Sequence, residues 1–150
     1  MILIDTNALI VLILGLMDPK LIGNHKRTSI YGEQDYYNLI SIISDFNNLV
    51  VLPNVWTEVD NLLNGFGGDY KNGYVFTISE TIKKTTEKYL ESKIATESYA
   101  FYDLGLTDSL ILEHSRNCDL LITSDSRLSD YANANGVRVY DIVKERNNRL

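Results

Sequence analysis

Four carboxylate residues, far apart in the chain, are the side chains best suited to carry chemistry. They are Asp5, Glu58, Asp108 and Asp125. Carboxylates brought together repel and raise one another's pKa values, so a cluster is costly unless a cation lies between them. Mg²⁺ and Mn²⁺ prefer oxygen ligands, act as Lewis acids and lower the pKa of bound water. The set therefore predicts a Mg²⁺ or Mn²⁺ site suited to hydrolysing a phosphodiester bond.

Two of these acids directly follow predicted strands. Asp5 comes after the wholly apolar residues 1–4, and Asp125 comes just past the predicted strand 119–123, D-L-L-I-T. Short apolar runs of this kind are typical of buried strands in a parallel sheet. Ligands of open parallel sheets bind outside the carboxyl ends of the strands, so we expect both acids at that edge.

The other two acids lie near the starts of predicted helices. Glu58 is one turn into the helix that follows the apolar strand 49–52. Asp108 lies at the start of the helix that precedes the strand at 119–123. Both positions adjoin the carboxyl ends of strands, so all four acids are expected to converge on one edge of the sheet.

Each acid also has a purely structural explanation. Asp5 and Asp125 are suited to capping helix N-termini. Asp108 suits the positive end of its helix, and Glu58 suits a solvated helix face. Their joint placement, rather than any single residue, favours a site.

Apolar strands alternate with helical patterns along the chain, which is typical of a parallel sheet covered on both faces. The predicted strands are residues 1–4, 49–52, 119–123 and 137–140, and the predicted helices are residues 8–16, 33–46, 53–63, 75–89, 106–116 and 126–133. Residues 17–32 and the glycine-rich residues 65–73 are predicted loops, residues 144–150 a polar tail, and residues 91–105 fit no single pattern. A chain of 150 residues fits one α/β domain, residues 1–150.

The amino-acid composition limits the cellular location expected for the protein and the class of cofactor it can bind. Cys118 is the only cysteine, which excludes an internal disulfide and a multi-thiolate metal site and fits a reducing cytoplasm. Asp5 interrupts the apolar N-terminus, and the apolar run that follows is too short to span a bilayer, so no membrane association is expected.

The formal charge of −6 is unusual for a nucleic-acid binder. Metal ions at the four acids would cancel part of that charge.

Four motifs in order together resemble a PIN domain. They are I-L-I-D-T-N at 2–7, P-x-V-W-T-E at 53–58, L-x-L-T-D-S-L-I at 104–111 and L-L-I-T-S-D at 120–125. The resemblance implies a three-layer α/β/α sandwich with a parallel sheet of four or five strands. It also implies Mg²⁺- or Mn²⁺-dependent cleavage of RNA.

The resemblance also assigns roles to individual residues. It implies that the metal ligands are Asp5, Glu58, Asp108 and Asp125, with Asp60 as the alternative to Glu58. Asn7 matches an asparagine that supports the first aspartate, and Thr123 matches a hydroxyl residue that hydrogen-bonds to a carboxylate or water. The size resembles single-domain toxins of toxin–antitoxin systems, which implies an antitoxin partner, a homodimer, or a role in defence against phage.

Substrate contacts beyond the acids are less defined. Arg127, two residues past Asp125, is placed to contact a substrate phosphate. The ten tyrosines are suited to stacking on unpaired bases. Tyr36 and Tyr89, however, fall on apolar helix stripes and are predicted to belong to the core or an interface.

Two other functions stay open. Phosphoryl transfer through an aspartyl nucleophile at Asp5 would require a second acid where Asn7 stands. A nuclease-like scaffold that binds RNA or protein without cutting would keep the fold without the chemistry.

Overall fold

The computed structural model describes residues 1–150 as an α/β fold built on one parallel sheet. The strands are β1 (Ile2–Ile4), β2 (Leu49–Val51), β3 (Thr86–Glu87), β4 (Leu120–Thr123) and β5 (Val139–Asp141). Their order across the five-stranded sheet is β3-β2-β1-β4-β5, and every neighbouring pair is parallel. The predicted fold class, an α/β/α sandwich with a central parallel sheet, is confirmed.

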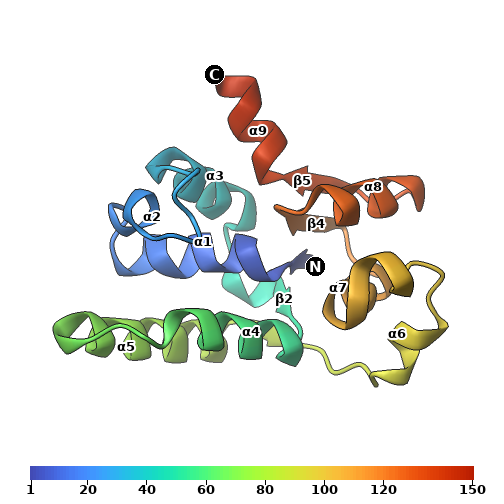
Figure 1. Cartoon of the computed structure of the whole chain (residues 1–150), viewed down its shortest axis with the longest axis horizontal. Helices are drawn as coiled ribbons and strands as arrows, with labels where there is room; N and C mark the ends of the chain where they lie inside the picture. Colours follow the sequence, from blue (N-terminus) through green and yellow to red (C-terminus); the bar gives the residue numbers. More distant parts are fainter.

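Helices cover both faces of the sheet. They are α1 (Thr6–Met17), α2 (Leu21–Asn24), α3 (Glu33–Ile43), α4 (Pro53–Leu63), α5 (Gly68–Lys84), α6 (Lys93–Glu97), α7 (Phe101–Ser115), α8 (Ser126–Ala134) and α9 (Ile142–Arg149), with a 3-10 turn at Phe46–Asn48. In Figure 1, α1 lies between α3 above and α4 and α5 below, while α6, α7 and α8 form a group at the right. None of the helices is both long and apolar enough to cross a lipid bilayer.

The central helix α1 is apolar on all sides because other helices surround it. It packs against α2, α3, α4 and α5, and its residues 8–15 are all buried. A helix with this composition is stable only inside a core. Asp5 begins it as the N-cap, directly after the central strand β1. The fold therefore fixes Asp5 at the carboxyl end of the middle strand.

A glycine divides α7 and sets the position of Asp108. Gly105 has φ 77° and ψ −171°, a conformation that essentially only glycine adopts. The chain turns there and starts a second helical segment at Leu106, in agreement with the predicted helix at 106–116. Asp108 thus lies in the first turn of that segment.

Some predicted elements were wrong. The helix predicted at 75–89 ends at Lys84, and β3 follows within the predicted range. At its other end this helix extends back into the predicted loop 65–73, because α5 begins at Gly68. Burial of Tyr74 and Ile78 against the core outweighs the low helix propensity of the glycines there.

Two further segments are more ordered than predicted. The predicted loop 17–32 contains the short helix α2. The expected polar tail forms most of α9, which projects from the top of Figure 1. Asp141 caps this helix by accepting hydrogen bonds from the backbone N–H groups of Val143 and Lys144, at 3.0 and 3.2 Å. Its last turn is held to α3 by an ion pair between Arg149 and the buried Asp35.

Candidate functional site

Asp5 is the most buried of the predicted site acids. Its side chain is 3% exposed. Oδ1 accepts the backbone N–H of Ala8 at 2.9 Å, and Oδ2 accepts the Thr123 hydroxyl and the Ser124 backbone N–H. Burial raises the pKa of Asp5 to about 6, although these hydrogen bonds partly oppose the rise. Asp5 is thus a helix cap whose buried carboxyl group holds its proton more tightly than an exposed aspartate does.

Asp125 lies across the central strands from Asp5 and is tied to it through Thr123. Because β1 and β4 are paired, their carboxyl ends adjoin, and Asp125 follows β4 by two residues. The Thr123 hydroxyl donates to Asp5 and accepts the backbone N–H of Asp125 at 2.9 Å. The expected hydrogen bond from Thr123 to a carboxylate is therefore present. Asp125 caps α8 by accepting the Leu128 N–H at 3.0 Å.

Glu58 faces the same region from the first turns of α4. The Thr6 hydroxyl donates a hydrogen bond to Glu58 Oε1 at 3.1 Å. The residue next to Asp5 therefore holds Glu58. Glu58 also lines a shallow cavity of about 330 Å³ together with Thr107, the neighbour of Asp108. Asp60, the alternative to Glu58, points elsewhere because it accepts the Tyr74 hydroxyl at 2.6 Å.

The pKa of Asp108 is raised by burial and by the charges of the other three acids. Burial, followed by the charges of Asp5, Asp125 and Glu58 in that order, raises the pKa of Asp108 to about 7. Electrostatic coupling of this kind requires the carboxylates to be near one another. The four acids therefore occupy one region at the carboxyl edge of the sheet.

The acids are neighbours without forming a ready-made ligand shell. No group of three or more Asp, Glu, His or Cys side chains lies close enough together to hold a metal ion. Charge coupling extends over several ångströms, whereas Mg²⁺ ligation requires oxygens at about 2.0–2.1 Å. The carboxylates of Asp5, Asp125 and Glu58 accept hydrogen bonds from Ala8, Leu128 and Thr6, respectively. The four acids thus lie in one region, but they are not close enough together to ligate one metal ion.

No positively charged side chain neutralises these acids. The ion pairs of the chain join other residues, and none includes Asp5, Glu58, Asp108 or Asp125. An uncompensated all-oxygen donor set matches the preference of Mg²⁺ and Mn²⁺ over softer metals. The donor chemistry therefore fits such an ion, although the side chains would have to move toward it.

Comparison with known proteins adds no family assignment. No family model matches the chain, and no curated protein matches it. The chemistry of the site is thus argued from its own residues.

Two other residues, Asn7 and Arg127, were predicted to contribute to the site. Asn7 is exposed and makes no hydrogen bond to Asp5, which is held instead by Thr123, Ser124 and Ala8. Arg127 is exposed at the start of α8 and pairs with no carboxylate. It is therefore free to contact an anion beside Asp125.

Sequence reasoning missed two residues that support the site. Thr6 donates a hydrogen bond to Glu58, and Tyr31, which is 7% exposed, lies near enough to Asp5 for the charge of that carboxylate to contribute, after burial, to the raised pKa of its phenol. Burial raises the pKa of Tyr31, so its phenol stays neutral beside the acids. The sequence pointed to Thr6, because this residue lies between Asp5 and Asn7 in the first motif. Nothing in the sequence pointed to Tyr31, because it is distant along the chain from its neighbours at the site.

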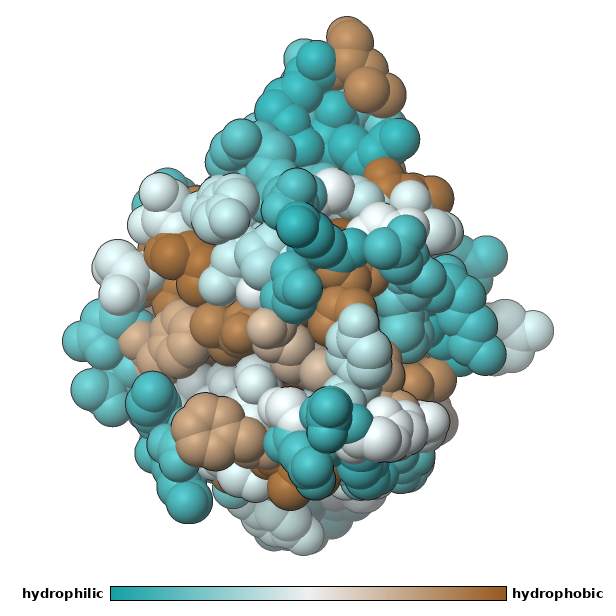
Figure 2. Space-filling view, turned by 90° about the vertical axis from the view of Figure 1, so that its left-hand side faces the viewer, coloured by the Kyte–Doolittle hydropathy of each residue, from teal (hydrophilic) through white to brown (hydrophobic).

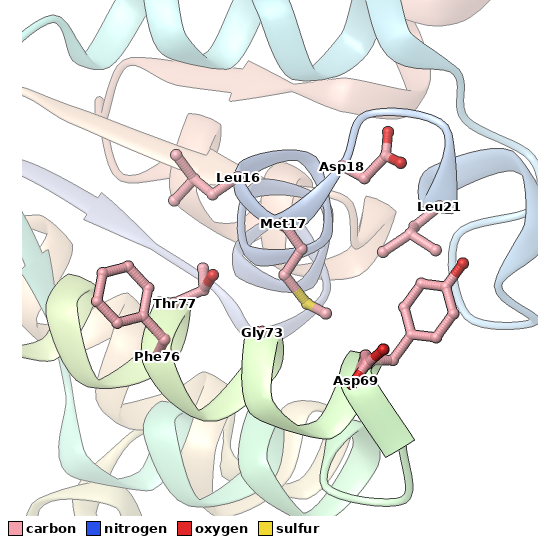
Figure 3. A pocket seen from close by; sticks show the side chains of 9 residues that line it. Leu16, Met17, Asp18, Leu21, Asp69, Gly73, Phe76 and Thr77 are labelled. Atoms are coloured by element: carbon pink, nitrogen blue, oxygen red, sulfur yellow. The ribbon is translucent and has the colours of Figure 1, made fainter. Parts of the chain in front are cut away.

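A separate apolar cavity lies at the opposite end of α1. Its volume is about 460 Å³, and its apolar lining includes Leu16, Met17, Leu21 and Phe76. Met17 extends from α1 toward Gly73 of α5 (Figure 3), and brown apolar surface crosses this side of the molecule (Figure 2). Because α1 has 12 residues, it separates this cavity from Asp5 by about 18 Å. The residues predicted as the loop 65–73 adjoin this cavity and not the acids.

Proposed function

We propose that this chain is a metal-dependent ribonuclease of the PIN-domain type that hydrolyses RNA phosphodiester bonds. The observation that carries the proposal is the placement of these acids at the carboxyl edge of a parallel sheet, where Thr123 hydrogen-bonds to both Asp5 and Asp125 and Thr6 holds Glu58. The four motifs that resemble a PIN domain, in the same order, contain these acids. Phosphoryl transfer through Asp5 is less well supported, because Asn7 stands where a second acid would be needed.

The proposed ion is Mg²⁺ or Mn²⁺, held by Asp5, Glu58, Asp108 and Asp125. When bound, such an ion polarises a phosphate and lowers the pKa of a coordinated water. The protein's own contribution is positional. Thr123 and the Ser124 N–H orient the Asp5 carboxylate, Thr6 orients Glu58, and the helix start after Gly105 orients Asp108. Arg127 is placed to contact a phosphate beside Asp125.

The proposal is tested by cleavage of a single-stranded RNA in Mn²⁺ buffer. Asp5→Asn removes a charge and keeps the shape of the side chain, so we expect the rate to fall by about 100-fold or more. Asp130→Asn, an exposed aspartate on α8 away from the acids, is the matched control and should keep full activity. Full activity of a correctly folded Asp5→Asn variant would exclude the proposed chemistry.

A second candidate is an RNA-binding scaffold that does not cut. The observation favouring it is that no three of the acids are close enough to hold a metal ion. This scaffold would bind RNA in both the wild-type and Asp5→Asn forms and cleave it in neither. The other expected partners, an antitoxin and a second copy of the chain, rest on the family resemblance alone.

A further inference from the structure

The outer face of the long helix α5 carries a large aromatic side chain that no other element covers. The helix lies at the lower edge of the molecule in Figure 1 and buries Tyr74, Ile78 and Thr81 on its inner face. Phe76, on the opposite side, is 67% exposed. It also borders the apolar cavity beside Met17 (Figure 3), so apolar surface extends from the helix onto its neighbour. Exposed apolar surface of this kind indicates a contact with another molecule.

The exposed face of α5 has opposite charges at its two ends. Asp69 lies in the first turn and Lys83 in the last turn, and both side chains are exposed. Phe76 lies midway, seven residues from each, and seven residues make about two helical turns, so all three share one face. Asp69 has no ion-pair partner. Lys83 contacts only the exposed Glu80, at 3.9 Å, and a pair of this kind contributes little to stability.

The order of acid, ring and cation makes this face complementary to itself. When two copies of α5 lie side by side in opposite directions, related by a two-fold axis at Phe76, the two Phe76 rings meet at the axis. Asp69 of each copy then lies opposite Lys83 of the other, so the symmetry forms the same ion pair twice. The antiparallel arrangement also brings opposite ends of the two helix dipoles together. A parallel arrangement would instead place like charges opposite each other.

The middle of the face has room for a second helix. Gly73 and Ser79, three residues before and after Phe76, are both small. A Cβ atom at Gly73 would meet only the Cε atom of Met17, at 4.0 Å, so the space above this glycine is open. Small residues on either side of a large one allow two helix faces to interlock at an interaxial distance of about 8–10 Å. The adjoining cavity, which Leu16 helps to line, extends the apolar area that such a contact would bury.

We propose that the exposed face of α5 is the interface of a homodimer, in which two antiparallel α5 helices meet at Phe76 and are joined by two ion pairs between Asp69 and Lys83. The grounds are the charge order and the shape of this helix face, and not the family resemblance. None of the four acids belongs to the face, and the contact requires neither a metal ion nor RNA. The proposal therefore stands or fails independently of the proposed nuclease activity.

Sedimentation equilibrium over a range of protein concentrations, without metal or RNA, measures the self-association. The wild type should form a dimer. Phe76→Ala should weaken the dimer by about tenfold or more, because both rings at the centre of the interface are lost. Asp69→Lys and Lys83→Asp should each weaken it by about tenfold or more, because each change brings two pairs of like charges together. Asp130→Lys reverses an exposed charge on α8 and should associate like the wild type.

A mixture of the two charge-reversed variants tests the antiparallel arrangement itself. Asp69→Lys has a lysine at both positions and Lys83→Asp has an aspartate at both, so a heterodimer of the two variants regains both ion pairs. The mixture should therefore associate about as strongly as the wild type, although each variant alone does not. The double variant with both changes should do the same. Because all of the changed side chains are exposed, the thermal midpoints of the dilute variants should stay unchanged, which separates loss of the dimer from loss of the fold.

Three outcomes would overturn the proposal. A wild type that stays monomeric at every concentration would mean that a different partner, or none, covers this face. A dimer that persists unchanged in Phe76→Ala and in both charge-reversed variants would place the interface elsewhere on the molecule. A mixture of Asp69→Lys and Lys83→Asp that stays monomeric would exclude the antiparallel pairing.

Discussion

At the scale of single residues, the aspartates of the site serve the fold and the chemistry together. Asp5 and Asp125 cap helices, as their simplest structural explanation predicted, and they also share a hydrogen-bond network through Thr123. Asp125 uses only Oδ1 for its cap, so its other oxygen remains available. Capping and ion binding are therefore compatible roles.

These positions were predictable because a strand end is visible in the sequence. Asp5 and Asp125 follow apolar runs, and the parallel sheet necessarily brings those ends to one edge. The contact of Thr6 with Glu58 was not predictable, because it joins residues 52 apart whose side-chain directions depend on packing. For the same reason, sequence alone could not tell that Asn7 is exposed and makes no hydrogen bond to Asp5.

The raised pKa values predict a stability that depends on pH. Burial raises the pKa of Asp5 to about 6 and that of Asp108 to about 7, so the folded state holds these protons more tightly than the unfolded state. Their stabilisation is complete below about pH 4 and is lost as the pH rises through 6 and 7. For Asp5 alone the loss is about 3 kcal/mol. Urea unfolding in the presence of a chelator, at a series of pH values, measures this dependence.

Asp108→Asn isolates one part of that pH dependence. The variant cannot ionise at this position, so we expect it to unfold at a higher urea concentration than the wild type at pH 8, and at a similar one at about pH 4. Asp130→Asn, whose carboxylate is exposed, should follow the wild type throughout. A variant at position 108 that loses stability in parallel with the wild type would contradict the coupling.

At the scale of elements, α1 and α3 pack closely against each other at Gly15. A Cβ atom at Gly15 would lie 2.0 Å from Cδ1 of Tyr36, so only a hydrogen atom fits there. Tyr36 is buried against the core, as predicted from its place on an apolar stripe, whereas Tyr89 is 82% exposed and lies neither in the core nor on a helix. The error arose because α5 ends before Tyr89 and β3 intervenes.

Gly15→Ala tests this packing. The added methyl group must displace the Tyr36 ring, and overpacking of this kind costs about 1–3 kcal/mol. Gly23→Ala is the matched control, because nothing lies within 4 Å of the added atom there. Chemical denaturation compares the two variants, and equal stability would show that α1 and α3 are packed less closely than described.

Short elements escaped prediction for a physical reason. The strand β3 has two residues, too few to show any periodicity. It forms because Thr86 and Glu87 pair with Val50 and Val51 of β2, which are distant in sequence. The helix α9 is polar after Ile142 and Val143, and it is held by the Asp141 cap, the buried Ile142 and the ion pair of Arg149 with Asp35. Long apolar segments were predictable because their own composition requires burial.

At the scale of the whole molecule, the two ends of the central helix differ in character. Asp5 and the other acids lie at its start, and the apolar cavity lies at its end (Figures 2 and 3). Uncompensated acids at one edge are the feature on which the proposed binding of a divalent ion rests. The central claim is therefore that these acids bind such an ion.

Calorimetric titration with Mn²⁺ at pH 8 tests that claim most directly, because it requires neither an RNA nor a turnover. The account predicts binding with a Kd below about 1 mM. It also predicts that Asp5→Asn and Asp108→Asn each weaken binding by about tenfold or more, while Asp130→Asn does not. Absence of binding at millimolar Mn²⁺, or equal binding by the Asp5→Asn variant, would contradict the account.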